Sequence, residues 1–264
     1  MQLWVTDRWE NFKGPIKTLF ECVDTREVNG ENALSISCLA ALDKGAAALT
    51  VSSGTAAIAF TVLNILRAGD ELVSANNLYG GTYTQFDAIL PQYGIKTRFA
   101  KVNDFAATEA AINDRTRAIY IETVGNPVLD VADIEEYSKI AVRHHLPLIV
   151  DSTFTPPTLL RPIEHGADIV IHSLSKWIGG HGTAIGGAVI DAGKFDWSDP
   201  KFALYNEPDR GYHGLRFAHD LGANNHLAFI LRLRTVGLRN QGPTLAPDAA
   251  WQFLQGVETL PLRM

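Results

Sequence analysis

The sequence predicts an α/β protein in which a mainly parallel sheet lies between layers of helices. Short apolar segments alternate with segments of helical periodicity between residues 46 and 190, which is the pattern of strands joined by crossover helices. Residues 147–150 are apolar at consecutive positions, as in a strand buried on both faces. The chain has 264 residues, which is enough to bury a large core as one domain.

The composition excludes several classes of protein. Hydrophobic residues make up 46% of the chain and charged residues 20%, as in an ordinary globular protein. The formal charge of −6 offers no basic surface for nucleic acid, and no apolar run approaches the roughly 20 residues that span a membrane. The N-terminal residues lack the charged-then-apolar build of a secretory signal. Cys22 and Cys38 form no disulfide framework, so a reducing compartment, by default the cytoplasm, is expected.

Strands and helices are expected in a regular order from Leu39 onwards, whereas residues 1–38 show only weak periodicity. The expected strands are 46–51, 71–75, 96–100, 117–122, 147–150, 167–171 and 185–190. The expected helices are a first one ending near Leu42, then 56–67, 82–93, 104–113, 133–145, 159–165, 218–237 and 247–260. Asp104 is a plausible helix cap. The helix at 133–145 has a predicted buried stripe of Ile134, Tyr137, Ile140 and Ala141.

Small residues follow the first expected strand. Ser53, Gly54 and Thr55 lie where a strand runs into a helix. Free backbone N–H groups and the positive end of the helix dipole at such a turn suit a phosphate. An N-cap serine followed by a permissive glycine explains the same residues equally well. Tyr79 follows the next strand, at the edge where open α/β sheets place their ligands, and packing is its alternative role.

Asp151 and Lys176 both follow buried strands. A carboxylate at Asp151 is costly unless it meets a positive charge, and a turn cap is the alternative. Lys176 follows Ser173 and Ser175 and precedes Gly179. A lysine in a partly desolvated cleft loses its proton more easily, and only the neutral amine attacks an aldehyde; a solvated surface lysine is the alternative. Pyridoxal phosphate (PLP) is the aldehyde cofactor that uses a protein lysine in this way. The intervening βαβ unit would bring both residues to one edge of the sheet.

Several motifs together resemble one family. The segment 172–187, HSLSKWIGGHGTAIGG, is similar to the lysine segment of the PLP-dependent enzymes of cysteine and methionine metabolism, the trans-sulfuration family. LYGGT at 78–82, ETVGNP at 122–127 and VDSTF at 150–154 follow the order of that family. The similarity runs from about Leu39 to Met264. GGHGT and the later EPDRGYHGL look most like the O-acetylhomoserine sulfhydrylase branch.

The resemblance implies a fold and a set of site residues. Residues 39–264 are expected to form a PLP-binding large domain of the aspartate-aminotransferase type, after a divergent segment 1–38 and without the family's C-terminal small domain. Lys176 and Tyr79 are the implied catalytic residues, and no metal is expected. The implied cofactor-binding residues are Ser53, Gly54, Thr55, Tyr79, Asn126, Asp151, Thr153, Ser173, Ser175 and Lys176.

The implied function is a PLP-dependent γ-replacement on O-acetyl-L-homoserine with sulfide or a thiol, giving homocysteine or methionine. Cystathionine γ-synthase or methionine γ-lyase activity would use the same residues. A dimer or tetramer is implied, with no nucleic-acid or membrane partner. No counterpart of the family's phosphate-binding arm is found in residues 1–38. A weak or inactive truncated paralogue that binds PLP or a full-length partner is therefore the alternative. A nucleotide site on residues 179–187 fails, because their spacing matches neither a P-loop nor GxGxxG.

Overall fold

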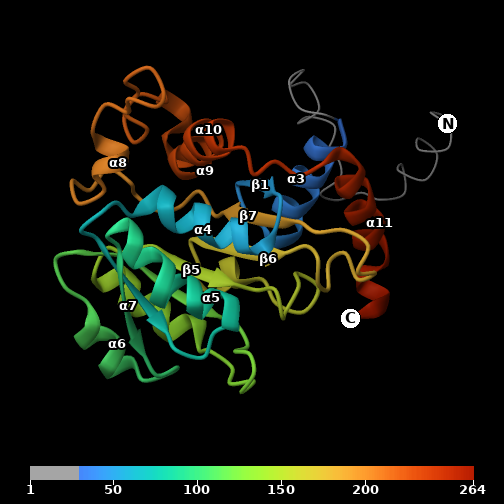
Figure 1. Cartoon of the computed structure of the whole chain (residues 1–264), viewed down its shortest axis with the longest axis horizontal. Coiled ribbons are helices and arrows are strands. Elements are labelled where there is room, and N and C mark those ends of the chain that lie inside the picture. The colour runs from blue at the N-terminus through green and yellow to red at the C-terminus, as the bar shows by residue number, and fades with distance from the viewer. Residues whose placement is uncertain (1–29) are drawn as a thin grey trace.

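A seven-stranded sheet forms the centre of the protein (Figure 1). The computed structural model describes residues 30–264, with side chains from residue 37, so most of the expected segment 1–38 lies outside the described residues. The strand order is β1-β7-β6-β5-β4-β2-β3. The strands are β1 Ala47–Val51, β2 Glu71–Ala75, β3 Lys96–Ala100, β4 Thr116–Glu122, β5 Leu148–Asp151, β6 Ile169–Ser173 and β7 Gly187–Asp191. Strands β2 to β6 pair in parallel, whereas β7 is antiparallel to both β6 and β1. The predicted α/β class with a mainly parallel sheet is confirmed.

Helices cover the sheet on both sides. The α-helices are α3 Gly30–Asp43, α4 Gly54–Ile65, α5 Gly80–Thr84, α6 Phe105–Ala111, α7 Ile134–Arg143, α8 Ala203–Asn206, α9 Ala228–Arg232, α10 Arg239–Gln241 and α11 Pro247–Arg263. Helix α11 (red) packs beside α3 (blue), although the two are far apart in the sequence (Figure 1). No helix in the described part of the chain combines the length and the apolar character needed to cross a bilayer.

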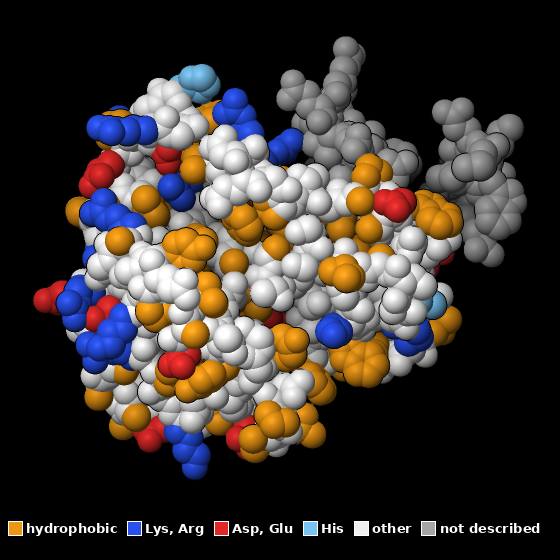
Figure 2. All heavy atoms as spheres, viewed as in Figure 1, with side chains coloured by type: hydrophobic (Ala, Val, Ile, Leu, Met, Phe, Trp, Pro, Cys, Tyr) orange, Lys and Arg blue, Asp and Glu red, His pale blue; other side chains and the backbone are white. Residues whose placement is uncertain are grey.

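Two buried clusters lie on opposite faces of the sheet. Because side chains alternate along a strand, Ile169 and Ile171 of β6 point into one cluster and Val170 points into the other. The first cluster holds the apolar face of α4, and the second holds Leu39 of α3 with the stripe of α7. On the face drawn in Figure 2, acidic and basic side chains are interspersed. Because both faces of the sheet are covered by these clusters, a ligand site is expected in the loops at the ends of the strands.

Local sequence explains several helix starts. Asp104 accepts a hydrogen bond from Ala107 N at 2.9 Å and caps α6, as predicted. Asp133 caps α7 in the same way through Glu136 N at 3.2 Å. These side chains satisfy backbone N–H groups that the first turn of a helix leaves free. The predicted stripe of α7 is buried at all four positions, which are Ile134, Tyr137, Ile140 and Ala141.

Three expected helices differ from the structure. The helix predicted at 159–165 is wrong: only a 3₁₀ turn, Pro162–His165, forms there. Pro162 holds the preceding Arg161 in an extended conformation, which prevents a helix from running through it. The run predicted at 218–237 begins later, as a 3₁₀ segment Gly222–Leu227, and continues through α9 into a π-helical segment Leu233–Leu238.

The run predicted at 82–93 is helical throughout but mixed in type. Helix α5 passes into a π-helical turn, Gln85–Ile89, and then into a 3₁₀ turn, Leu90–Tyr93. It ends at Gly94, whose φ of 75° suits a residue without a β-carbon.

Candidate functional site

Five loops meet at one edge of the sheet. Strands β2, β4, β5 and β6 run in parallel, and β1 shares their direction because it is antiparallel to the antiparallel strand β7. The carboxyl ends of all five strands therefore lie at one edge. The loops that leave this edge carry every predicted site residue. The fold thus brings together the segments 52–55, 76–79, 123–126, 151–153 and 173–176.

The N-terminus of α4 packs directly on Ser173. Ser53 caps the helix by accepting a hydrogen bond from Ala56 N at 3.0 Å. A β-carbon on buried Gly54 would lie 2.5 Å from Ser173 Cβ and 2.8 Å from its Oγ. The N–H groups of Gly54 and Thr55 have no hydrogen-bond acceptor in the described part of the chain. Two free N–H groups beside a serine hydroxyl form a set of donors that suits a phosphate.

Asp151 lies at the centre of a hydrogen-bonded chain of groups. Its Oδ1 accepts from Thr153 N at 2.9 Å, and its Oδ2 accepts from Tyr120 Oη at 3.3 Å. Thr153 Oγ1 in turn accepts from Ser173 N at 2.8 Å. These bonds link the end of β5 to the end of β6 and so to the α4 turn.

The Asp151 carboxylate is buried without a lysine or arginine partner. Burial raises the pKa of Asp151, and the bonds from Thr153, the charge of His172 and the Tyr120 hydroxyl oppose that rise. No lysine or arginine among the described residues forms an ion pair with it. A buried carboxylate of this kind is stabilised by an incoming cation, which suits the protonated ring nitrogen of PLP.

Glu122 is a site residue that the sequence reasoning did not select. It ends β4 as the register partner of Asp151, and its Oε1 accepts a hydrogen bond from Tyr79 N at 2.9 Å. Burial and the nearby Asp151 charge raise the pKa of Glu122 to about 8. The available signal was an acidic residue closing an apolar strand at the start of ETVGNP. Glu122 therefore ties the backbone of Tyr79 to the strand end beside Asp151.

Tyr79 and Asn126 lie at the same edge but are open to solvent. The Tyr79 side chain is 51% exposed. Asn126 is exposed on the loop after β4, and its side chain has no hydrogen-bond partner among residues 30–264. That loop is closed by bonds from Gly125 N to Asp130 O at 3.0 Å and from Leu129 N to Gly125 O at 2.8 Å. Neither side chain is committed to packing, so both are available to a ligand.

Lys176 lies on the turn directly after β6. Its N–H donates to Ser173 O at 3.2 Å, and Gly180 N donates to Lys176 O at 2.7 Å. The side chain is exposed. The expected partly desolvated environment is therefore not formed by residues 30–264, in which the Lys176 side chain stays exposed.

The loop that carries Lys176 is clasped at two places. Ser175 Oγ accepts from Gly186 N at 3.0 Å and donates to Gly186 O at 3.3 Å, which closes the loop across residues 176–185. From α11, Arg263 donates to Trp177 O at 2.7 Å and to Ile178 O at 3.1 Å. Ser175 was predicted to bind the cofactor, and in this structure its hydroxyl is occupied by the loop backbone.

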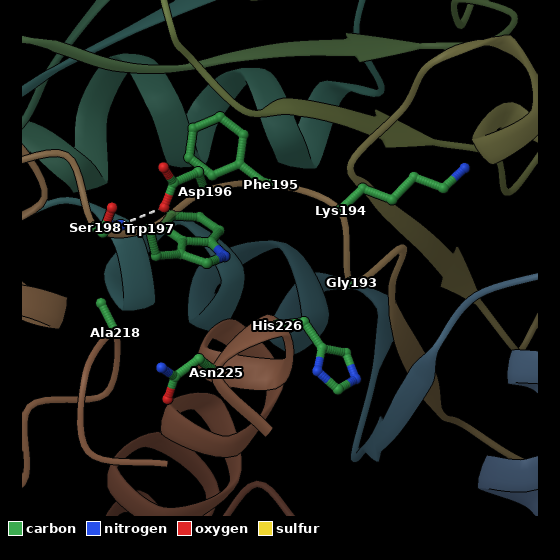
Figure 3. Close-up of a pocket in the computed structure, with 9 residues that line it drawn as sticks. All are labelled: Gly193, Lys194, Phe195, Asp196, Trp197, Ser198, Ala218, Asn225 and His226. Carbon is green, nitrogen blue, oxygen red and sulfur yellow. Dashed lines mark hydrogen bonds between the residues drawn. The ribbon is translucent and has the colours of Figure 1, made fainter. Parts of the chain in front are cut away.

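A separate hollow of about 200 Å³ lies at the other edge of the sheet (Figure 3). It follows the carboxyl end of the antiparallel strand β7. In Figure 3 the Lys194 side chain extends away from Trp197 and Ala218. None of the predicted site residues lines it. Its lining residues are Gly193 to Ser198, Ala218, Asn225 and His226. No group of three potential metal ligands occurs in the described part of the chain.

Comparison with known proteins gives consistent matches. A model of the family described as Cys/Met metabolism PLP-dependent enzyme matches residues 21–264. O-acetyl-L-homoserine sulfhydrylase from Leptospira meyeri is 47% identical over 250 residues, covering 93% of this chain and 57% of the relative. Homocysteine synthase from Schizosaccharomyces pombe is 46% identical over 229 residues, covering 86% of this chain and 53% of the relative. The chain thus spans about half the length of the curated relatives that it matches.

Solved structures agree with the sequence matches. A putative O-acetylhomoserine (thiol)-lyase from Campylobacter jejuni superposes with a TM-score of 0.84 at 36% identity, covering 90% of this chain and 59% of that one. That structure carries N'-pyridoxyl-lysine-5'-monophosphate. O-acetylhomoserine sulfhydrylase from Wolinella succinogenes superposes with a TM-score of 0.77 at 35% identity, covering 89% of this chain and 64% of that one.

Proposed function

Because the chain belongs to the Cys/Met metabolism PLP-dependent enzyme family, we propose that it binds PLP at the edge where β1, β2, β4, β5 and β6 end. The observation that carries this proposal is the buried Asp151 carboxylate, which is joined through Thr153 and Ser173 to the free N–H groups at the start of α4. The site therefore offers a carboxylate that can pair with a cation and N–H groups that can bind an anion, and hydrogen bonds connect the two. PLP carries both charges on one molecule.

Different residues would hold different parts of the cofactor. Asp151 would hold the ring nitrogen, and the N–H groups of Gly54 and Thr55 with the Ser173 hydroxyl would hold the phosphate. Tyr79 is free to lie over the ring, and Asn126 is free to reach its phenolic oxygen. PLP, when bound, supplies an electron sink for charge that develops on the substrate. Residues 39–264 form the PLP-binding large domain in this proposal.

We propose the reaction of the sulfhydrylase branch. O-acetyl-L-homoserine loses acetate from its γ carbon and gains sulfur there from sulfide or a thiol, giving homocysteine or methionine. The Lys176 amine is the base that takes the proton from Cα and moves protons at Cβ. The similar proteins named above as O-acetylhomoserine sulfhydrylase and homocysteine synthase support this choice. We place the reaction in the cytoplasm, in keeping with only two cysteines in the chain.

A second candidate is a protein that binds PLP without efficient turnover. The exposure of Lys176 favours it, because no described residue encloses the amine or holds it in place for proton transfer. A homo-oligomer in which a second copy covers this edge would remove that difficulty. We therefore propose a dimer or tetramer as the active form.

Reductive labelling tests the binding proposal. The protein is mixed with PLP, reduced with borohydride, digested and analysed by mass spectrometry. Lys176 should carry the cofactor mass, and Lys194, which follows β7 at the other edge, serves as an internal control. Labelling of both lysines to the same extent, or of neither, contradicts a specific site. The release of acetate from O-acetyl-L-homoserine is then measured with and without sulfide. Release that depends on sulfide supports the enzyme, and no release supports the protein that binds PLP without efficient turnover.

A further inference from the structure

A histidine and an aspartate are completely buried behind the candidate site. His172 on β6 and Asp43 at the end of α3 have no exposed side-chain surface. His172 Nε2 lies 2.8 Å from Asp43 Oδ2, and His172 Nδ1 lies 3.2 Å from Ser152 O. The two residues are 129 positions apart in the chain. Neither is among the residues that the proposed function uses.

The contacts limit the protons that His172 can carry. A backbone carbonyl only accepts, so Nδ1 must carry a hydrogen to bond Ser152 O. Nε2 faces a carboxylate oxygen, and the pair shares one further proton. His172 is then either an imidazolium facing a carboxylate or a neutral ring facing a protonated acid.

The surroundings favour the imidazolium. Burial by itself lowers the pKa of His172, but the charges of Asp43 and Asp151 and the bonds to Asp43 and Ser152 O together outweigh burial and raise it. The charged groups acting on the ring come from α3 and β5. From β7, the residue in register with His172 is the apolar Ala188. A buried cation between two carboxylates is thus the state with the better charge balance.

His172 also acts on the residue that would hold the ring nitrogen. Its positive charge lowers the pKa of Asp151 and so opposes the rise that burial causes. Its Nδ1 forms a hydrogen bond with the carbonyl oxygen of Ser152, the residue that follows Asp151. Ser152 N donates to Ile171 O at 2.9 Å, so the two strands hold this relationship rigidly.

We propose that His172 is a buried cation which keeps Asp151 ionised toward the ring nitrogen of PLP, and that Asp43 holds His172 in this charged form. Both are positioning residues, because they act through Asp151. The inference rests on the proposed function for the identity of the ligand. The protonation state of His172 is nevertheless a property of the cofactor-free protein and can be measured separately.

Nitrogen-15 NMR of the cofactor-free chain tests the first half. The His172 ring should show both nitrogens protonated at neutral pH, because its pKa is raised above the ordinary histidine value by Asp43, Asp151 and Ser152 O. The H172Q variant assigns the signal. A His172 signal with one bare nitrogen at pH 7 overturns the inference, whatever the protein does with PLP.

The D43N variant tests the second half. We expect its affinity for PLP, measured by absorbance titration, to fall about tenfold at pH 8, because His172 without the Asp43 carboxylate no longer holds a positive charge beside Asp151. The loss should shrink as the pH is lowered and His172 regains its proton. A packing defect would persist at the lower pH. E135Q is the matched control, because Glu135 pairs with His165 at 2.9 Å on the surface; its affinity should equal wild type.

The outcomes separate the two proposals. Failure of the wild-type chain to bind PLP contradicts the proposed function and leaves the NMR result to decide the state of His172. Normal PLP binding by both wild type and D43N at pH 8 contradicts the role of Asp43. If D43N does not fold, the NMR measurement on wild type still decides whether a buried imidazolium exists.

Discussion

Glu122 and Asp151 stand opposite each other in register at the carboxyl ends of β4 and β5. Both carboxyl groups are buried, and each raises the cost of ionising the other. Two adjacent buried acids do not ionise at the same pH. Their two apparent pKa values describe the pair and not either residue alone. His172 lies on the Asp151 side of this pair, which favours Asp151 as the ionised member and Glu122 as the protonated one.

The E122Q variant should change how stability depends on pH. The folded-state pKa of Glu122 is about 8, above its unfolded value near 4.5. Its contribution is therefore fully present below pH 4.5 and is lost as the pH rises through 8. Glutamine keeps an oxygen for Tyr79 N but cannot ionise. Urea unfolding at pH 5 and pH 8 should show wild type losing on the order of a few kcal/mol more than E122Q between the two. Equal losses would contradict the raised pKa.

The G54A variant should damage the proposed phosphate cradle. The new β-carbon would lie 2.9 Å from the backbone Cα of Ser173, which cannot rotate away as a flexible side chain would. We expect a loss of about 1–3 kcal/mol in unfolding free energy and weaker PLP binding by absorbance titration. G237A is the control, because its β-carbon would make ordinary contacts at 3.4 and 3.5 Å inside a helical run. An unchanged PLP affinity in G54A would argue against this turn as the phosphate site.

The R263A variant should loosen the Lys176 loop. Arg263 donates to three backbone carbonyls, those of Trp177, Ile178 and Gly256. Without it, the turn after Lys176 loses two hydrogen bonds to α11 and keeps only its packing against that helix, so the amide of Gly180 should exchange faster with deuterium. Borohydride labelling of Lys176 should become less complete. Q255A, an exposed position on the same helix, should change neither quantity. Unaltered exchange in R263A would show that other contacts hold the loop.

Local patterns predicted the sheet well because their causes are local. Strands β2 and β3 have the predicted bounds, since each is a short segment bounded by turn residues. The Asp104 cap depends on a residue three positions away. In contrast, the helix expected at 159–165 does not form, because Pro162 keeps Arg161 extended. That restriction was visible in the sequence, but the prediction gave more weight to the apolar pattern.

The candidate site was predictable only in part. Motif resemblance selected residues that the fold brings to one edge, and their roles stay predictions. It missed Glu122, Asp43 and Tyr120, because their importance comes from contacts across strands and helices. The exposure of Lys176 also depends on what covers the edge, which no spacing in one chain reveals. Contacts between residues that are distant in the sequence determine the electrostatics of the site, whereas local turn motifs show only which loops form it.

The roles of Ser173 and Ser175 can be separated by matched variants. Ser175 Oγ both accepts from and donates to Gly186, so S175A should release this clasp, cost about 1 kcal/mol of stability and speed deuterium exchange at the Gly186 amide in the cofactor-free protein. S173A removes a hydroxyl that lies beside Gly54, so it should leave Gly186 exchange unchanged and weaken PLP binding. The S175T variant, which keeps the hydroxyl, should restore slow exchange. If S175A weakened PLP binding without affecting Gly186 exchange, Ser175 would be a cofactor ligand and the loop would be closed by other bonds.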